Sequence, residues 1–320
     1  MNSDARRAVG IDVGGTKIAA GVVDGRGRLL SELVEPTPVP SFGESVTPIL
    51  LDLVARLRKE DPDVEAVGLG AAGMVRWPEG RVVWAPNNAY RDWPVRAELA
   101  AATGLPVAVD NDANVATLAE SRLAERPYRD MVLLTLGTGI GGGILLGGEL
   151  YRGPTGMGTE LGHIVVDPDG PVCACGGHGC LEAYASGSAL GRMGREAAAA
   201  DPDGLIARLG GPGGVTGPTV TAAAMRGDAV ARGLFDRLGR WLGVGIASLA
   251  TIFELEAVLI GGGLSETGEL LLAPTRSAVA EFAYAREARG VVPVLAASCG
   301  SDAGMIGAAL LALDARDSMG

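Results

Sequence analysis

The sequence of 320 residues is poor in cysteine, histidine and aromatic residues, and it has no surplus of positive charge. Its four cysteines, three of them in one short segment, provide no disulfide framework and fit a reducing cytoplasm. The net charge of −11 argues against nucleic acid as a partner, because a phosphate backbone requires a basic surface. Segment 1–15 lacks the apolar core of a signal peptide, and the most apolar segment, 244–264, is interrupted by Glu254 and Glu256. We therefore expect a cytoplasmic protein without a membrane span.

Strand patterns and glycine turns organise the chain. Three apolar runs within residues 8–34 are separated by glycine-rich turns, which predicts a three-stranded meander. Residues 131–143 begin the same pattern again, with a strand followed by a glycine turn. Helical patterns lie between further strands, and Asp92 is expected to cap a helix that ends at Gly104. The alternation predicts an α/β protein with two similar halves.

One short segment collects three of the cysteines and both histidines. Cys173, Cys175 and Cys180 are spaced closely enough to share one ion, and a hairpin could bring His163 to them. Three thiolates and an imidazole form a tetrahedral zinc set. From spacing alone, His178 could replace His163 as the fourth ligand. Unpaired cysteines or a disulfide are the alternative explanation of the spacing.

A zinc ion with four protein ligands leaves no position for a substrate, so the metal is expected to maintain the shape of this loop. Glu160 and His163 precede the cysteines and Glu182 follows them, so a rigid loop would hold three polar side chains that could converge on a hydroxyl-rich ligand. The alternative is that the two glutamates are solvated surface carboxylates.

Three glycine clusters each follow a predicted strand. Backbone N–H groups in such loops can approach phosphate oxygens, because no Cβ is in the way. The first cluster is not a P-loop, since Lys17 follows Gly15 and Thr16 in the wrong order. A hairpin turn explains each cluster singly, but three of them together with Asp12 predict a nucleotide site. The clusters are Gly14-Gly15-Thr16, the run 137–143, which includes Thr138 and Gly139, and Gly261-Gly262-Gly263.

Asp112 lies where a buried strand is predicted to end and a helix to begin. This is a usual position for a catalytic carboxylate in an open α/β sheet. The same position also suits a structural N-cap. Asn111 beside it, and Asn87 and Asn88 after a proline, are amides suited to hydroxyl recognition or to turns.

Six motifs follow one another between residues 8 and 310. They are Asp12-x-Gly-Gly-Thr-Lys17, Asn111-Asp112, Leu136-Gly-Thr-Gly-Ile-Gly-Gly-Gly143, Glu160-x-Gly-His163, Cys173-x-Cys-Gly-x-x-Gly-Cys-x-Glu182 and Gly261-Gly-Gly263. Together they closely resemble the ROK family, whereas the glycine loops alone indicate the wider actin, hexokinase and Hsp70 superfamily. The resemblance implies two ribonuclease-H-like α/β domains with a nucleotide and sugar cleft between them. Residues 1–111, completed by the C-terminal helix 303–320, are expected to form the small domain, and 112–302 the large domain with the zinc loop.

The resemblance also implies an activity, which is ATP-dependent phosphorylation of the 6-hydroxyl of a hexose. We expect the hexose to be glucose rather than N-acetylmannosamine, N-acetylglucosamine, mannose or fructose. Asp112 is the implied base, and Asp12 is expected to contact Mg²⁺ through water. The glycine clusters and Lys17 are expected to hold ATP. The implied sugar ligands are Asn87, Asn111, Asp112, Glu160, His163 and Glu182.

Three other function classes are alternatives to this activity. Repressors of the family carry a winged helix-turn-helix before the sugar-binding core, and here the first predicted strand already begins near residue 8. A zinc-ribbon interaction module normally has two Cys-x-x-Cys knuckles, and this chain has one atypical cluster. A non-catalytic sugar sensor is the third alternative. For the assembly, the resemblance suggests a homodimer or a homotetramer.

Overall fold

The computed structural model describes residues 6–38, 46–85 and 91–317, and its chain divides into two compact units. Unit 1 contains Met1–Arg129, Gly143–Thr159 and Ser298–Gly320, and unit 2 contains Asp130–Gly142 and Glu160–Ala297. The division differs from the boundary expected after Asn111, because the helix that begins at Asp112 packs within unit 1 against the C-terminal helix.

The first sheet, in unit 1, has the strand order β3-β2-β1-β4-β8. β1 (Arg7–Val13) pairs antiparallel with β2 (Lys17–Asp24), and β2 pairs antiparallel with β3 (Leu29–Pro36). β1 also pairs parallel with β4 (Val64–Ala71), and β4 pairs parallel with β8 (Val107–Asn111). The predicted meander is therefore present, extended by two parallel strands.

The other elements of unit 1 cover this sheet or join its strands, except for β11, which is an edge strand of the other five-stranded sheet. Helices α1 and α2 pack with the large apolar side chains of one face, and α3 and α11 lie on the other. The elements are α1 (Thr47–Glu60), β5 (Met74–Arg76), β6 (Arg81–Trp84), β7 (Arg91–Trp93), α2 (Val95–Thr103), α3 (Asp112–Leu123), β11 (Glu149–Tyr151), the 3-10 turn η5 (Gly300–Asp302) and α11 (Ala303–Asp317).

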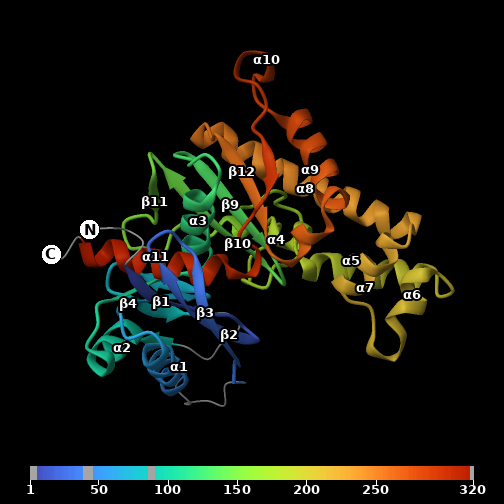
Figure 1. Ribbon diagram of the computed structural model, residues 1–320. Helices are drawn as coiled ribbons and strands as arrows, with labels where there is room; N and C mark the ends of the chain where they lie inside the picture. The colour runs from blue at the N-terminus through green and yellow to red at the C-terminus, as the bar shows by residue number, and fades with distance from the viewer. Residues whose placement is uncertain (1–5, 39–45, 86–90, 318–320) are drawn as a thin grey trace. The chain divides into compact units, whose positions relative to one another are not determined.

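Helix α11 lies directly on β1 and β4, as Figure 1 shows with the red helix beside the blue strands. A Cβ added to Gly10 would lie 1.9 Å from the carbonyl oxygen of Met305, and one added to Gly68 would lie 1.8 Å from that of Ala308. The helix carries its own glycine, since a Cβ at Gly307 would lie 1.7 Å from the carbonyl oxygen of Val115 in α3. These contacts are shorter than any side chain permits, so glycine is required on both surfaces.

The second five-stranded sheet has the order β11-β10-β9-β12-β13, which matches the order of the first sheet strand for strand. β12 pairs parallel with both β9 and β13, and β10 pairs antiparallel with β11. The repeated topology agrees with the two similar halves predicted from the sequence. The strands are β9 (Met131–Leu136), β10 (Ile140–Leu146), β12 (Ala257–Gly261) and β13 (Val294–Ala296).

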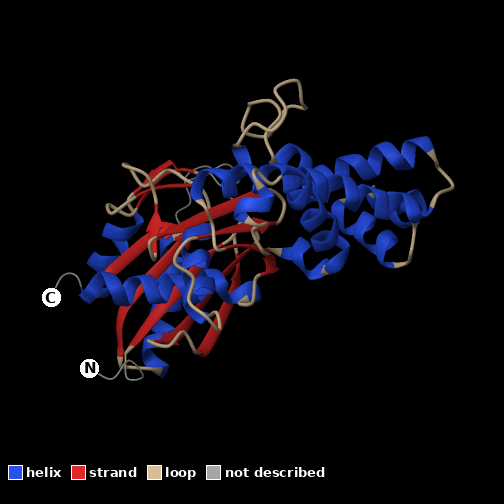
Figure 2. Ribbon diagram, turned by 90° about the horizontal axis from the view of Figure 1, so that it is seen from above, coloured by secondary structure: helices blue, strands red, loops and turns tan. Residues whose placement is uncertain are grey.

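Unit 2 contains more helix than unit 1, and Figure 2 shows a group of blue helices that extends beyond its sheet. The longest, α8, packs closely against α9 because Gly239 and Gly243 face Pro274 and Ala278. The helical elements are η2 (Leu161–His163), α4 (Glu182–Ala185), α5 (Gly187–Ala200), α6 (Leu205–Gly210), η3 (Gly211–Gly213), α7 (Gly217–Met225), α8 (Ala229–Phe253), η4 (Gly263–Thr267), α9 (Glu269–Phe282) and α10 (Arg286–Arg289).

One predicted helix start is wrong. Asp92 does not cap α2, because it lies in β7 with a φ of 52°, and Pro94 occupies the position before Val95. Pro94 occupies the cap position, and its side chain accepts no hydrogen bond from the first turn of the helix. Among the described residues, no helix has the length and apolar character needed to cross a membrane.

Candidate active site and metal centre

Asp112 occupies the first position of α3, directly after β8. The helix cap is Asn111, whose Oδ1 accepts the N–H groups of Ala113 at 2.9 Å and Asn114 at 3.2 Å. Capping is therefore done by the neighbour of Asp112, although Asp112 Oδ1 also accepts the N–H of Ala113. Burial raises the pKa of Asp112 above that of an exposed aspartate, which brings the carboxylate nearer to the range useful for a general base.

Asp12 lies near the end of β1 in the same unit. A Cβ added to Gly304, in the first turn of α11, would lie 2.8 Å from its carboxyl carbon. Burial and the negative charge of Asp112 raise the pKa of Asp12 to about 7, and the positive charge of Lys17 opposes this rise. Two carboxylates whose charges repel each other are suited to a hard divalent cation such as Mg²⁺.

The first glycine cluster forms the turn between β1 and β2. Gly14 N–H donates to the carbonyl of Lys17 at 3.0 Å, and Thr37 is bound to both ends of the turn through Gly14 O and Thr16 O. Gly15, Thr16 and Lys17 are exposed. The turn is thus held in one conformation, and its tip faces solvent.

The other two glycine clusters lie against each other in unit 2. Gly262 has a φ of 78°, and a Cβ added there would lie 2.5 Å from the carbonyl oxygen of Leu136, the residue that precedes the second cluster. The second cluster is also tied to the start of α5, because Gly187 donates to Gly137 O and Ser188 to Thr138 O. The sequence-predicted nucleotide loops of this unit therefore form one connected surface.

Glu182 joins the second glycine cluster to the cysteine segment. Its Oε2 accepts the N–H of Ile140 at 2.8 Å, and its Oε1 lies 3.5 Å from Cys173 Sγ. A Cβ added to Gly139 would lie only 2.2 Å from Glu182 Oε2. A valine at position 139, which from the sequence alone should block phosphate access, would therefore also displace Glu182.

The three cysteines and His163 form a compact group. Their ligand atoms all lie within 4.8 Å of one another, with Cys175 Sγ 3.7 Å from Cys180 Sγ and Cys173 Sγ 3.7 Å from His163 Nδ1. Tetrahedral sulfur ligands of zinc are separated by about 3.8 Å, so the donor set fits this ion. His178 is exposed and does not belong to the group.

The segment that carries this group is folded back on itself, and the thiol of Cys173 is buried. The segment is folded back by two isolated β-bridges, Val165 with Cys180 and Val172 with His178. Burial raises the pKa of Cys173 to about 12, so a thiolate there at neutral pH requires a nearby positive charge. Because His163 faces the group through Nδ1, its Nε2 is directed elsewhere and can bind a ligand.

Asn87 and Glu160 are two further predicted sugar ligands. Asn87 and Asn88 lie outside the described residues. Glu160 is exposed and precedes the η2 turn, where its carbonyl accepts the N–H of His163.

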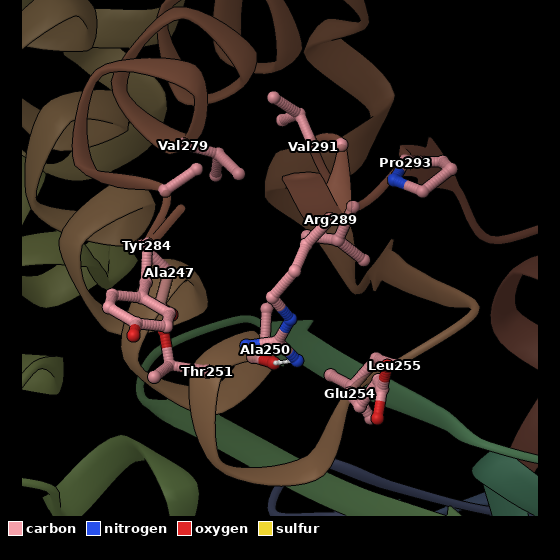
Figure 3. A pocket seen from close by; sticks show the side chains of 13 residues that line it. Ala247, Ala250, Thr251, Glu254, Leu255, Val279, Tyr284, Arg289, Val291 and Pro293 are labelled. Atoms are coloured by element: carbon pink, nitrogen blue, oxygen red, sulfur yellow. Dashed lines mark hydrogen bonds between the residues drawn. The ribbon is translucent and has the colours of Figure 1, made fainter. Parts of the chain in front are cut away.

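A cavity of about 160 Å³ lies elsewhere in unit 2, at the end of α8. Figure 3 shows Arg289 reaching across it, where a guanidinium nitrogen lies 3.5 Å from the carbonyl oxygen of Ala250. None of the candidate residues within the described ranges lines this cavity.

Among known protein families, the model of the ROK family matches residues 8–315 of this chain. A glucokinase of Streptomyces coelicolor is 41% identical over 309 residues, which cover 95% of this chain and 96% of the relative. An N-acetylmannosamine kinase of Escherichia coli is 35% identical over 308 residues, covering 95% and 97%. The crystal structure of a ROK family glucokinase from Streptomyces griseus in complex with glucose and AMPPNP is 44% identical, with a TM-score of 0.85 and coverage of 96% and 99%.

The chain belongs to the ROK family. It has the two-domain α/β fold of the actin and hexokinase superfamily, and its two five-stranded sheets have the same strand order.

We predict that the purified protein contains about one zinc ion per chain and that Cys175→Ser loses it. A structural zinc site contributes folding free energy on the order of 10 kcal/mol, so the segment around Glu182 should lose its structure and the glucose KM should rise. Elemental analysis and steady-state kinetics measure the two effects. Cys299→Ser, which changes the one cysteine outside the group, is the control and should retain zinc. A Cys175→Ser protein with full zinc content contradicts the assignment.

Proposed function

We propose that the protein is an ATP-dependent hexose kinase that transfers the γ-phosphoryl group of ATP to the 6-hydroxyl of glucose. The half-buried Asp112, with its raised pKa and its helix already capped by Asn111, is the observation that most favours this function. The similarity to glucokinases along nearly the whole chain, including one solved with glucose and an ATP analogue, supports the same activity.

In the proposed reaction Asp112 takes the proton of the 6-hydroxyl as that oxygen attacks the γ-phosphorus. The bond to the bridging oxygen breaks, and ADP leaves with the electron pair. Asp12 would contact a bound Mg²⁺ through water, and the ion would supply neutralisation of the phosphate charge. Since phosphoryl transfer depends on position and charge, most of the remaining residues act by orienting the two substrates.

The sugar is assigned to amide, carboxylate and imidazole groups. Glu160, Glu182 and His163 Nε2 bind hydroxyl groups, and a zinc ion held by His163 and the three cysteines would maintain the conformation of the segment that carries them. Glu182 suits this role because the N–H of Ile140 already holds one of its oxygens. Asn111 has one amide N–H bound to the carbonyl of Gly73, and its second N–H completes the proposed set together with Asn87.

The nucleotide is assigned to the glycine clusters and Lys17. The exposed turn at Gly15 and the surface formed by the clusters at Gly137 and Gly262 present backbone N–H groups for phosphate oxygens. The protein is further proposed to act in the cytoplasm as a homodimer or homotetramer, in accord with the family resemblance of its motifs.

N-acetylmannosamine kinase is the second candidate activity, because relatives with that name are about a third identical in sequence. Both sugars carry a 6-hydroxyl, so the same carboxylate would serve either reaction. ADP release measured with each hexose separates the two activities. A non-catalytic sugar sensor would bind a sugar and release no ADP.

We predict that Asp112→Asn lowers kcat with glucose by about 10²- to 10⁴-fold, because the 6-hydroxyl keeps its proton without a carboxylate. Glucose affinity and melting temperature should change little, since Asn111 continues to cap α3. In the wild type, kcat should fall as the pH decreases through the pKa of Asp112, which burial raises, and the residual rate of the variant should lack this decrease. A variant that retains more than about a tenth of wild-type kcat rules out Asp112 as the base.

We also predict that Gly263→Val raises the ATP KM at least about tenfold and leaves the glucose KM nearly unchanged. A change of about tenfold is what the loss of one hydrogen bond to phosphate would cause. A Cβ at this exposed glycine has no neighbour within 4 Å, so the fold accepts a side chain that would obstruct phosphate. Gly213→Val is the matched control, because Gly213 is also exposed, lies in the same unit and has equally open surroundings. Equal ATP affinities of the two variants by calorimetry would remove position 263 from the nucleotide site.

A further inference from the structure

A buried ion pair lies beside the proposed base, within unit 1. The carboxylate of Asp110 is fully buried, and its Oδ2 accepts the Nε–H of Arg152 at 2.6 Å. Only 14% of the Arg152 side chain is exposed. Burial of a charge is costly, so a pair at this depth requires every oxygen and N–H group to be placed accurately.

The second oxygen of Asp110 binds the residues on both sides of Asp112. Oδ1 accepts the backbone N–H of Asn111 at 2.8 Å and the side-chain Nδ2–H of the fully buried Asn114 at 2.9 Å. Asn111 is the cap of α3, and Asn114 lies in its first turn. The carboxylate of Asp110 therefore restrains the chain before and after the proposed base.

Arg152 connects Asp110 to the segment 152–159, which leads to Glu160. Its guanidinium carbon lies 4.1 Å from the ring centroid of Trp77, and its Nη1 donates to the carbonyl of Leu150 at 3.3 Å. The same segment contacts Trp77 again, since a Cβ added to Gly156 would lie 2.3 Å from the backbone nitrogen of Trp77. Arg152 is thus held by an anion on one side and an aromatic face on the other.

The far end of this segment returns to Asn114. Thr159 Oγ1 lies 2.6 Å from the carbonyl oxygen of Gly158 and 3.3 Å from Asn114 Oδ1. Thr159 has a φ of 68°, a left-handed conformation that is unfavourable for a β-branched residue and that persists only where surrounding contacts enforce it. The next residue in the chain is Glu160.

We propose that Asp110 and Arg152 are positioning residues for the phosphoryl transfer. Their ion pair orients Asp112 through Asn111 and Asn114, and it sets the conformation in which segment 152–159 delivers Glu160. Neither side chain is assigned to the sugar or to the reacting atoms. This inference rests on the proposed function, because it assigns Asp112 and Glu160 to the substrate hydroxyl groups.

Asp110→Asn tests the pair, and the chain offers a closely matched control. An asparagine would turn an N–H donor or an uncharged oxygen toward Arg152 and leave that cation without its counter-charge. Asp24 is also buried, also accepts two backbone or amide N–H groups on Oδ1, and also binds an arginine Nε at 2.6 Å, that of Arg28. It lies at the end of β2, and Arg26 and Arg28, whose N–H groups its carboxylate accepts, are outside the candidate site.

Both variants are expected to melt at a lower temperature than the wild type. At a temperature where each remains folded, Asp110→Asn should lower kcat about 10- to 100-fold and weaken glucose binding severalfold, with the Kd of the ATP analogue unchanged. Asp24→Asn should retain kcat within about twofold. A folded Asp110→Asn enzyme with wild-type kcat and glucose affinity overturns the proposal, as does an equal loss of kcat in both variants.

If Asp110→Asn does not fold, Arg152→Lys decides the question. Lysine keeps the charge but lacks the planar group that stacks on Trp77 and the Nε–H that binds Asp110. A severalfold loss of kcat with an unchanged ATP KM is expected, and an unchanged kcat overturns the proposal.

Asp112→Asn is assayed beside these variants. A wild type without hexokinase activity contradicts the proposed function, whereas an active wild type with fully active Asp110 and Arg152 variants contradicts only the positioning role.

Discussion

The close approach of helix α11 to strands β1 and β4 is the contact on which unit 1 depends. Small residues of the strands, such as Ala8, Gly10 and Gly68, face α11, while their large neighbours face α1 and α2. Successive residues of a strand point to opposite faces, so one alternation of large and small side chains provides both surfaces. The helix backbone can then rest on the sheet, and the last part of the chain joins the first.

This packing also determines the environment of the acidic residues. The first turn of α11 reaches the carboxyl group of Asp12 through Gly304, where a side chain would collide with it. Asp12 is therefore desolvated, and Asp112 repels it, which together raise its pKa. Both effects disfavour two ionised carboxylates at this place, and a divalent cation would stabilise them.

Unit 2 is organised around a different contact, in which one glutamate connects two loops. Glu182 binds the backbone of the second glycine cluster and lies against a cysteine of the proposed zinc group. Gly139 has no side chain at the point where that carboxylate passes. The proposed zinc group, the proposed sugar ligand Glu182 and the second glycine cluster are thus coupled, and a change in one of them should affect the others.

The sequence by itself determined the features that depend on neighbours in the chain. These include the spacing of Cys173, Cys175 and Cys180, the glycine turns and the repeated strand pattern, because turn geometry and side-chain alternation are local properties.

Only the tertiary structure decided contacts between distant residues. It grouped His163 rather than His178 with the cysteines, it made Asn111 the cap, and it brought Arg152 to Asp110 across 42 residues. Asp110 stands two residues before Asp112 in the sequence, but a charge in a sequence does not reveal its partner. Folding selects the partner, because a charge removed from water is stable only where an opposite charge has been removed with it.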